Sequence, residues 1–216
     1  MSLFITFEGP DGSGKSTQIQ LLADFLRQRG YEVLCTREPG GTSIGDQIRQ
    51  VVHDVKNTEM AAQAEILLYS ASRAQLVEQV ILPQLAQGGV VLCDRYADST
   101  YAYQGYGRQL DLDILRLITR FATQELRPNL TIYLDVEVAE GLRRKVAANT
   151  SGQGEWNRMD RLAVEFHQRV RAGYLEMAHN EPERWLIIDA SAPVEEIHGV
   201  ICERLGKLLA LSVLSH

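Results

Sequence analysis

The feature that most constrains the fold is a glycine-rich segment near the start of the chain, GPDGSGKS at residues 9–16. It matches the pattern G-x-x-x-x-G-K-[ST]. An apolar run at 3–7 precedes it, and an amphipathic helical pattern at 15–29 follows. The glycines allow backbone N–H groups to approach phosphate oxygens, and the start of a helix adds partial positive charge. We therefore expect a strand, a phosphate-binding loop and a helix in this order.

Short apolar runs alternate with longer helical patterns along the rest of the chain. This alternation predicts an α/β fold with right-handed crossovers and a mostly parallel sheet that is buried on both faces. The expected strands are 3–7, 31–36, 90–94, 130–135 and 185–189. The expected helices are 15–29, 43–54, 58–87, 111–125, 137–148, 159–180 and 193–213, with Thr58 capping the third and a break before Pro83.

Twelve of the 17 glycines form five tight groups, which we interpret as loops; Gly105 and Gly107 make up one of them. Ligands of such folds bind beyond the carboxyl ends of the strands. The chemistry is therefore expected in the loops after residues 7, 36, 94 and 135.

The 216 residues include 22 Lys and Arg against 28 Asp and Glu, a net charge of −6. This balance disfavours nucleic acids and anionic membranes as partners. No linker or repeat divides the chain, so we expect a single domain over 1–216. The N-terminus does not resemble a secretory signal, and no run of about 18 apolar residues could span a bilayer. The prediction is a cytoplasmic protein.

The three cysteines, Cys35, Cys93 and Cys202, form no C-x-x-C pair. Cys35 and Cys93 lie in apolar strand-like runs, which predicts buried, unreactive thiols. We expect neither a disulfide nor a zinc site.

Within the phosphate loop, backbone N–H groups of residues 12–17 are expected to converge on phosphate oxygens. Lys15 is expected to bridge the β- and γ-phosphates, and Ser16 to offer its hydroxyl to Mg²⁺. Asp94 ends the apolar run VVLC and is the candidate for a second group near that ion, although strand ends also carry plain solvated acids. The N-K-x-D motif of regulatory GTPases and the L-S-G-G-Q-like signature of ABC-type ATPases are absent. Small-molecule kinases remain.

Five segments together carry a specific resemblance to thymidylate kinases of the bacterial type. They are FEGPDGSGKST (7–17), TREPGGTSIG (36–45), LLYSASRAQ (67–75), DRYADSTYAYQGYGR (94–108) and FHQRVRAGYLEMA (166–178). The resemblance implies a three-layer nucleoside monophosphate kinase fold, with a five-stranded parallel sheet flanked by helices and a mobile lid at about 143–160. It also implies transfer of the γ-phosphoryl group of MgATP to dTMP, giving dTDP and ADP, and a homodimer.

The same resemblance implies functional roles for individual residues. The implied ATP-binding residues are Gly9, Pro10, Asp11, Gly12, Ser13, Gly14, Lys15, Ser16, Thr17 and Arg143. The implied dTMP-binding residues are Asp11, Glu38, Pro39, Tyr69, Arg73, Arg95, Ser99, Thr100, Tyr103 and Gln104. Lys15, Arg95, Arg158 and Asp11 are implied to be catalytic. Ser16 and Asp94 are the metal candidates.

By this resemblance Tyr69 stacks on thymine, Arg73 reads a base carbonyl, Arg95 binds the acceptor phosphate and Tyr103 crowds out a 2′-hydroxyl. From the residues alone, Tyr69 could equally be a core aromatic side chain and Asp11 a simple turn former. Arg73 lies four residues after Tyr69, on the same helical face, which favours a functional pair.

The acceptor phosphate is already largely ionised at neutral pH, so the reaction needs no general base. Catalysis then depends on neutralising the transferring phosphoryl group. The stretch 143–171 carries an excess of four positive charges and includes the expected lid. Arg158 is our choice as the catalytic lid arginine, with Arg144 and Arg161 as rivals. The segment TSGQGEW (150–156) is interpreted as a hinge or tip of the lid.

Two other interpretations stay open. The chain could be another pyrimidine nucleoside monophosphate or deoxynucleoside kinase, because a phosphate loop and a basic lid serve that whole class. It could also be a regulatory nucleotide-binding protein without efficient transfer. The patterns at 58–82 and 111–125 are candidates for a homodimer interface.

Overall fold

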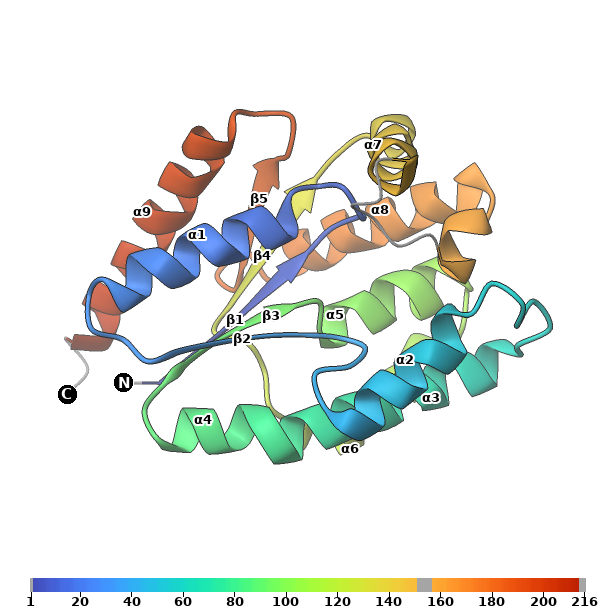
Figure 1. Ribbon diagram of the computed structural model, residues 1–216, viewed down its shortest axis with the longest axis horizontal. Helices are drawn as coiled ribbons and strands as arrows, with labels where there is room; N and C mark the ends of the chain where they lie inside the picture. The colour runs from blue at the N-terminus through green and yellow to red at the C-terminus, as the bar shows by residue number, and fades with distance from the viewer. Residues whose placement is uncertain (1, 151–156, 214–216) are drawn as a thin grey trace.

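The computed structural model describes residues 2–150 and 157–213, in which a five-stranded parallel sheet is enclosed by helices (Figure 1). The strands are β1 (Leu3–Glu8), β2 (Val33–Arg37), β3 (Val90–Asp94), β4 (Leu130–Asp135) and β5 (Trp185–Asp189). The α-helices are α1 (Lys15–Arg27), α2 (Ser43–His53), α3 (Ala62–Leu76), α4 (Leu82–Ala86), α5 (Ala97–Thr100), α6 (Leu112–Thr123), α7 (Val138–Thr150), α8 (Val164–Asn180) and α9 (Val194–Val213). Two π-helical segments, η1 (Val77–Ile81) and η2 (Tyr101–Gly107), and a 3₁₀ turn, η3 (Arg158–Arg161), complete the described elements.

The strand order is β2-β3-β1-β4-β5, with every pair parallel. The fold class predicted from the sequence is therefore confirmed. β1 lies at the centre, between β3 and β4. Because all five strands run the same way, the loops after β1, β3 and β4 meet at one edge of the sheet, where ligands of such folds bind.

Alternate residues of the central strand face different helical layers. Leu3, Ile5 and Phe7 of β1 pack with α1 and α9, which lie side by side on one face (Figure 1). Phe4 points to the opposite face and packs with α3 and η1. On that second face, α8 packs against β4 and β5. None of the described helices is both long and apolar enough to cross a membrane.

The helix expected over 58–87 differs from the structure at its predicted cap, Thr58, and at its predicted break before Pro83. α3 begins at Ala62, and Thr58 lies in a turn instead of capping a helix. The side chain of Asp54 accepts the N–H of Lys56 in this turn, at 2.9 Å. Pro83 does not end the helical run, because η1 leads directly into α4 and Pro83 falls in the first turn of α4. The proline thus lies next to a π-helical segment, where the regular α-helical hydrogen-bond pattern is already interrupted.

The interpretation of Gly105 and Gly107 as loop residues is wrong, since both lie in η2. A Cβ on Gly105 would come within 2.5 Å of Leu112, and one on Gly107 within 2.6 Å of Phe166. These glycines therefore serve close packing of η2 against α6 and α8, and not a turn.

The prediction that Cys35 is buried is also wrong. β2 is an edge strand in which no residue is fully buried, and Cys35 is exposed. Cys93 lies in the neighbouring β3 and is fully buried, as predicted. An apolar strand sequence does not by itself distinguish an edge position from a central one.

We expect a thiol reagent such as 5,5′-dithiobis(2-nitrobenzoate) to modify Cys35 in the folded protein well before Cys93, because Cys35 is exposed and Cys93 is buried. The measurement is the time course of absorbance for the wild type and for Cys35→Ser. If Cys35→Ser leaves the fast phase unchanged, the thiol of Cys35 is not the one that reacts first, and the prediction is wrong.

Candidate active site

A cavity of about 590 Å³ lies at the carboxyl ends of β1, β3 and β4. Its walls come from the phosphate loop, the turn after β2, α3, the segment after β3, α7 and α8. The following lining residues are among those that the sequence analysis assigned to nucleotide or metal binding: Pro10, Asp11, Gly12, Gly14, Lys15, Ser16, Thr17, Glu38, Pro39, Tyr69, Arg73, Asp94, Arg95, Ser99, Thr100, Tyr103 and Gln104. The structure thus brings the two proposed nucleotide sites together in one space.

The phosphate loop connects β1 to α1 in a conformation that needs glycine. Gly14, at the N-cap of α1, has a φ of 93°, in the left-handed region. Lys15 is 5% exposed, and its ammonium donates to the carbonyl oxygens of Gly9 and Pro10 at 3.1 and 3.0 Å. Burial and the nearby Arg95 lower the pKa of Lys15. The ammonium is therefore held inside the loop that is expected to bind phosphates.

Asp11 is surrounded by cations. Its carboxylate accepts a hydrogen bond from Nη2 of Arg95 at 2.8 Å and pairs with the ammonium of Lys145, while Nζ of Lys15 lies at 3.8 Å. Although burial would raise the pKa of Asp11, the charges of Arg95, Lys15 and Lys145 hold it well below its usual range. One fixed anion thus gathers three cations around the place expected for the reacting phosphates.

Arg95 lies in a tight turn directly after β3. Its φ is 70°, in the left-handed region that costs energy for a residue with a side chain. The turn is fixed by two hydrogen bonds to β1: Arg95 N–H donates to the carbonyl of Phe7 at 2.9 Å, and Tyr96 N–H donates to Glu8 Oε1 at 2.8 Å. The guanidinium carbon lies 5.2 Å from the ring centroid of Tyr103. This turn directs Arg95 towards Asp11.

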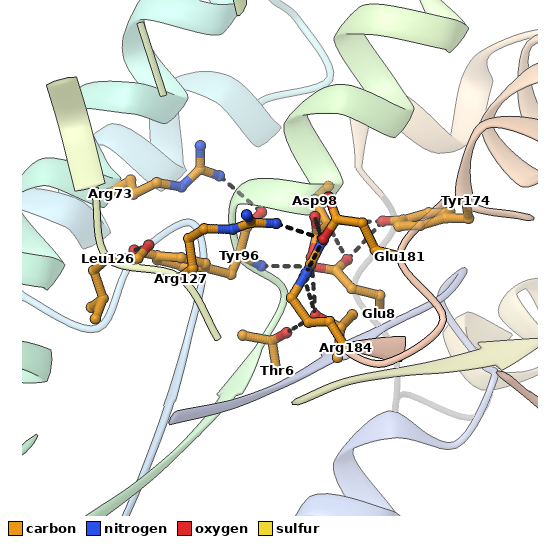
Figure 2. A network of polar contacts seen from close by, with 12 residues as sticks. Thr6, Glu8, Arg73, Tyr96, Asp98, Leu126, Arg127, Tyr174, Glu181 and Arg184 are labelled. Atoms are coloured by element: carbon orange, nitrogen blue, oxygen red, sulfur yellow. Dashed lines mark hydrogen bonds and ion pairs between the residues drawn. The ribbon is translucent and has the colours of Figure 1, made fainter. Parts of the chain in front are cut away.

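Glu8, the last residue of β1, is a fully buried carboxyl group within a network of polar contacts (Figure 2). Its Oε2 accepts from the hydroxyls of Ser99 and Tyr174 at 2.6 and 2.7 Å. Burial, reinforced by the neighbouring Asp98, raises the pKa of Glu8 to about 7. Asp98 is itself paired with Arg184, with two of their atoms 2.7 Å apart. Glu8 thereby connects β1 to the segment after β3 and to α8.

The proposed base-binding wall is held by Arg73, which is 2% exposed on α3. Its guanidinium donates to Glu38 Oε2 at 2.8 Å, to Thr100 Oγ1 at 2.8 Å and to the carbonyl of Tyr96 at 3.0 Å. Burial alone would lower the pKa of Arg73, but Glu38 raises it above its usual value. The hydroxyls of Ser99 and Thr100, which the resemblance assigns to dTMP binding, are hydrogen-bonded to Glu8 and Arg73 respectively.

Several predicted site residues do not line the cavity. Gly9 and Ser13 belong to the loop without facing the open space, and Arg143 is paired with Glu140 on the exposed side of α7. The guanidinium of Arg158 is buried, where it contacts the carboxylate of Glu65 and donates to the carbonyl of Val52 at 3.3 Å.

The other lid candidates were Arg144 and Arg161. Arg144 is bonded to Glu140 and to the carbonyl of Ala190. Residues 151–156, which make up most of the expected hinge, and the side chain of Arg161 lie outside the described part of the chain. The catalytic role of a lid arginine stays a prediction.

Sequence reasoning missed Lys145, Tyr174 and Glu8 as parts of the site. Lys145 lay within the basic stretch 143–171, but nothing in the sequence distinguished it from its neighbours. Tyr174 followed a helical pattern that is typical of core residues. His53 and His167 also line the cavity, although the sequence analysis assigned neither of them a role.

Ser16, the last residue of the phosphate loop, and Asp94, at the end of β3, are the candidate groups for Mg²⁺. Ser16 Oγ lies 3.5 Å from Asp94 Oδ2. Asp94 Oδ1 is buried and accepts no hydrogen bond from the described residues, and Nζ of Lys15 lies 3.9 Å from it. No cluster of three or more His, Cys, Asp or Glu residues that could hold a metal ion occurs in the described part of the chain. One hydroxyl and one carboxylate fit Mg²⁺, which commonly relies on few protein groups together with substrate phosphates and water.

The phosphate loop lies at the end of the central parallel strand and faces a second set of arginine and aromatic side chains across one cavity. This arrangement defines a P-loop nucleotide kinase.

Comparison with known proteins narrows this class. The family model for thymidylate kinase matches residues 7–201. A thymidylate kinase of Roseiflexus sp. (strain RS-1) is 56% identical over 216 residues, which cover 97% of this chain and 94% of the relative. One from Deinococcus radiodurans is 49% identical over 199 residues, covering 92% and 94%. The crystal structure of thymidylate kinase from Ehrlichia chaffeensis superposes with a TM-score of 0.75 at 32% identity, covering 94% of this chain and 98% of the other. The chain belongs to the thymidylate kinase family.

The raised pKa of Glu8 predicts a pH-dependent stability. Between its usual value of 4.5 and about 7, the folded protein holds a proton on Glu8 that the unfolded chain has released. Stability from this group therefore falls as the pH rises through that window. Relative to Glu8→Gln, we expect the wild type to lose on the order of 3 kcal/mol of unfolding free energy between pH 4.5 and 8. Urea unfolding at several pH values measures this difference, and equal pH profiles for both proteins would contradict it.

Proposed function

We propose that this protein transfers the γ-phosphoryl group of ATP to the phosphate of dTMP, giving dTDP and ADP. The observation that supports this most strongly is the contact between Asp11 of the phosphate loop and Arg95 of the facing wall. It joins a loop suited to a nucleoside triphosphate directly to a cation suited to a phosphate monoester. The family of the chain supports dTMP as the acceptor.

On the donor side, the phosphate loop and Lys15 are proposed to hold the triphosphate. Helix α1 begins at Lys15, so its partial positive charge and free N–H groups are directed at the loop. Ser16 and Asp94 are the groups that would hold Mg²⁺. When bound, this ion neutralises charge on the β- and γ-phosphates.

On the acceptor side, Arg95 is proposed to bind the phosphate of dTMP. Tyr69 and Arg73 lie one helical turn apart on α3 and line the same cavity, which suits a stacked base with a donor at its edge. Tyr103 lies beneath the guanidinium of Arg95 and is proposed to occupy the space that a 2′-hydroxyl would need. Glu38 and Pro39 close the wall behind Arg73.

The chemistry requires positioning and charge neutralisation and no general base, since the acceptor phosphate is largely ionised at neutral pH. Lys15 and Arg95 meet at Asp11, where both cations lie beside Oδ1 of the carboxylate. We propose that Asp11 fixes their separation while the phosphates bring their own negative charge. Fixed cations need no reorganisation as the phosphoryl group moves, which favours the transition state.

The whole chain is proposed to be a single domain in which residues 143–160 form a lid. Lys145 and Asp160 line the cavity from the two described ends of this stretch and lie 3.4 Å apart. Lys145 is proposed to supply to the cavity the positive charge that the sequence analysis assigned to Arg158. A cytoplasmic location stays a prediction from the N-terminal sequence.

A coupled assay that offers ATP with dTMP, dUMP, dCMP, UMP or thymidine tests the proposed reaction. We expect the highest kcat/KM with dTMP, and no phosphorylation of thymidine, because the nucleoside lacks the phosphate that Arg95 binds. Lys15→Ala is the matched control and should lower kcat by at least ~10²-fold. A stronger preference for another acceptor, or ADP release that does not depend on any acceptor, would contradict the proposal.

We further propose that the protein is a homodimer. Ile114, Leu117 and Phe121 follow the i, i+3, i+7 spacing along one face of α6 and are 59%, 70% and 88% exposed. α3 packs against α6 and adds Leu67, which is 57% exposed. Such a cluster of large apolar side chains on two adjoining helices is typical of a protein interface.

Phe121→Glu should shift the protein from dimer to monomer, because it places an unpaired charge at the most exposed side chain of the proposed apolar interface. Sedimentation velocity over a range of concentrations measures the change. Val200→Glu on α9 is the matched control, since Val200 is also exposed but lies away from α6. A monomeric wild type, or an equal effect of both replacements, would contradict this interface.

A further inference from the structure

Glu65 is a fully buried carboxylate on α3 that no motif singled out and that does not itself line the cavity. Its Oε1 accepts from Nε2 of Gln104 at 2.9 Å. Its Oε2 accepts from Nη2 of Arg108 at 2.9 Å and contacts the guanidinium of Arg158. Glu65 precedes Tyr69 by four residues and therefore lies on the face of α3 that carries the proposed base site.

The surroundings of Glu65 keep it ionised. Although burial alone would raise its pKa, hydrogen bonds from Arg108, Gln104 and Arg158 lower it below the usual value. An ionised carboxylate has no proton and can only accept hydrogen bonds. Gln104 must therefore present its amide nitrogen, and not its oxygen, to Glu65.

This requirement determines what Gln104 can offer to a ligand. A side-chain amide carries its donor and its acceptor on opposite sides of one carbon, so the oxygen of Gln104 is left to face other groups. Gln104 lines the cavity, as does Arg73, whose guanidinium can only donate. The two side chains together present one acceptor and one donor to the edge of a bound base.

Thymine and uracil match this pattern, because each has an N3–H donor next to the O4 carbonyl acceptor. Cytosine has the opposite pattern, with an unprotonated N3 next to an amino group. A cytosine in the same position would bring two acceptors together at Gln104 and two donors together at Arg73. Buried polar groups left unpaired in this way are a strong source of discrimination.

We propose that Glu65 is a positioning residue that determines base selectivity, by holding the amide of Gln104 so that its oxygen accepts the N3–H of thymine. The proposal rests on dTMP phosphorylation as the function of the cavity. Glu65 acts through Gln104 and does not touch the substrate.

Arg108 and Arg158 balance the buried charge of Glu65. The side chain of Arg158 is 6% exposed and that of Arg108 24%. Arg158 also donates to the carbonyl of Val52, so it connects η3 to both α2 and α3. These two arginines keep the carboxylate ionised, and its ionisation in turn fixes the orientation of Gln104.

The test is Glu65→Gln, which keeps the shape but provides an amide that can donate to the oxygen of Gln104. The side chain of Gln104 is then able to turn over. We expect the ratio of kcat/KM for dTMP to that for dCMP to fall by at least ~10-fold. KM for dTMP should rise more than kcat falls, because the groups around the phosphates are unchanged. The ratio of kcat/KM for dTMP to that for dUMP should stay as in the wild type, since both bases share N3–H and O4.

Arg108→Lys is the matched control, because it weakens a hydrogen bond to the same carboxylate but keeps a cation beside it, and Arg108 does not line the cavity. It should lower the thermal midpoint and keep the wild-type preference for dTMP over dCMP. Glu65→Asp is the second variant: it keeps the charge that both arginines require but withdraws the carboxylate from Gln104. Its dTMP to dCMP ratio should also fall.

Dissociation constants for dTMP and dCMP from calorimetry provide a readout that does not depend on turnover. If both Glu65 variants keep the wild-type ratio of kcat/KM for dTMP to that for dCMP, the inference is overturned. A wild type that does not phosphorylate dTMP overturns the proposed function instead, so the two failures can be distinguished.

Discussion

The ion pair between Asp11 and Arg95 is the contact around which the site is arranged. Asp11 belongs to the loop after β1 and Arg95 to the turn after β3, so the pair joins two neighbouring strand ends of the sheet. Lys15 and Lys145 gather on the same carboxylate. A site for two polyanions needs many cations, which would repel one another in the absence of substrate. One carboxylate at their centre lets them lie close together before any phosphate arrives.

Much of the fold and site follows from local signals in the sequence. The phosphate loop, the strand ends at Asp94 and Asp135, and the parallel sheet were predicted because each depends on a short pattern and on right-handed crossovers. The partners of individual charged side chains could not be predicted, because they depend on which elements meet in three dimensions. Arg158 is the clearest case: its place in a basic stretch indicated phosphate binding, whereas its guanidinium contacts Glu65, 93 residues earlier in the chain.

Three buried glutamates each hold one side of the proposed acceptor site. Glu8 fixes the turn of Arg95 through the N–H of Tyr96, Glu38 holds Arg73, and Glu65 holds Gln104. Burying a carboxyl group costs free energy unless it is well hydrogen-bonded. For the same reason, an arrangement that leaves it without these hydrogen bonds is unfavourable. The residues that face the proposed acceptor are thus each held by a buried carboxyl group, and Figure 2 shows Glu8 among its partners.

The π-helical segment Tyr101–Gly107 has a consequence for how this pocket can vary. A π-turn holds one residue more than an α-helical turn, and it resembles a one-residue insertion absorbed inside a continuous helix. Tyr103 and Gln104 lie within it, so their direction depends on that extra residue. Removing one residue upstream would restore regular winding and rotate the following side chains by about 100° around the axis. The shape of the pocket therefore depends on the direction in which successive side chains leave this helix. Insertions and deletions are tolerated here only where they keep those directions.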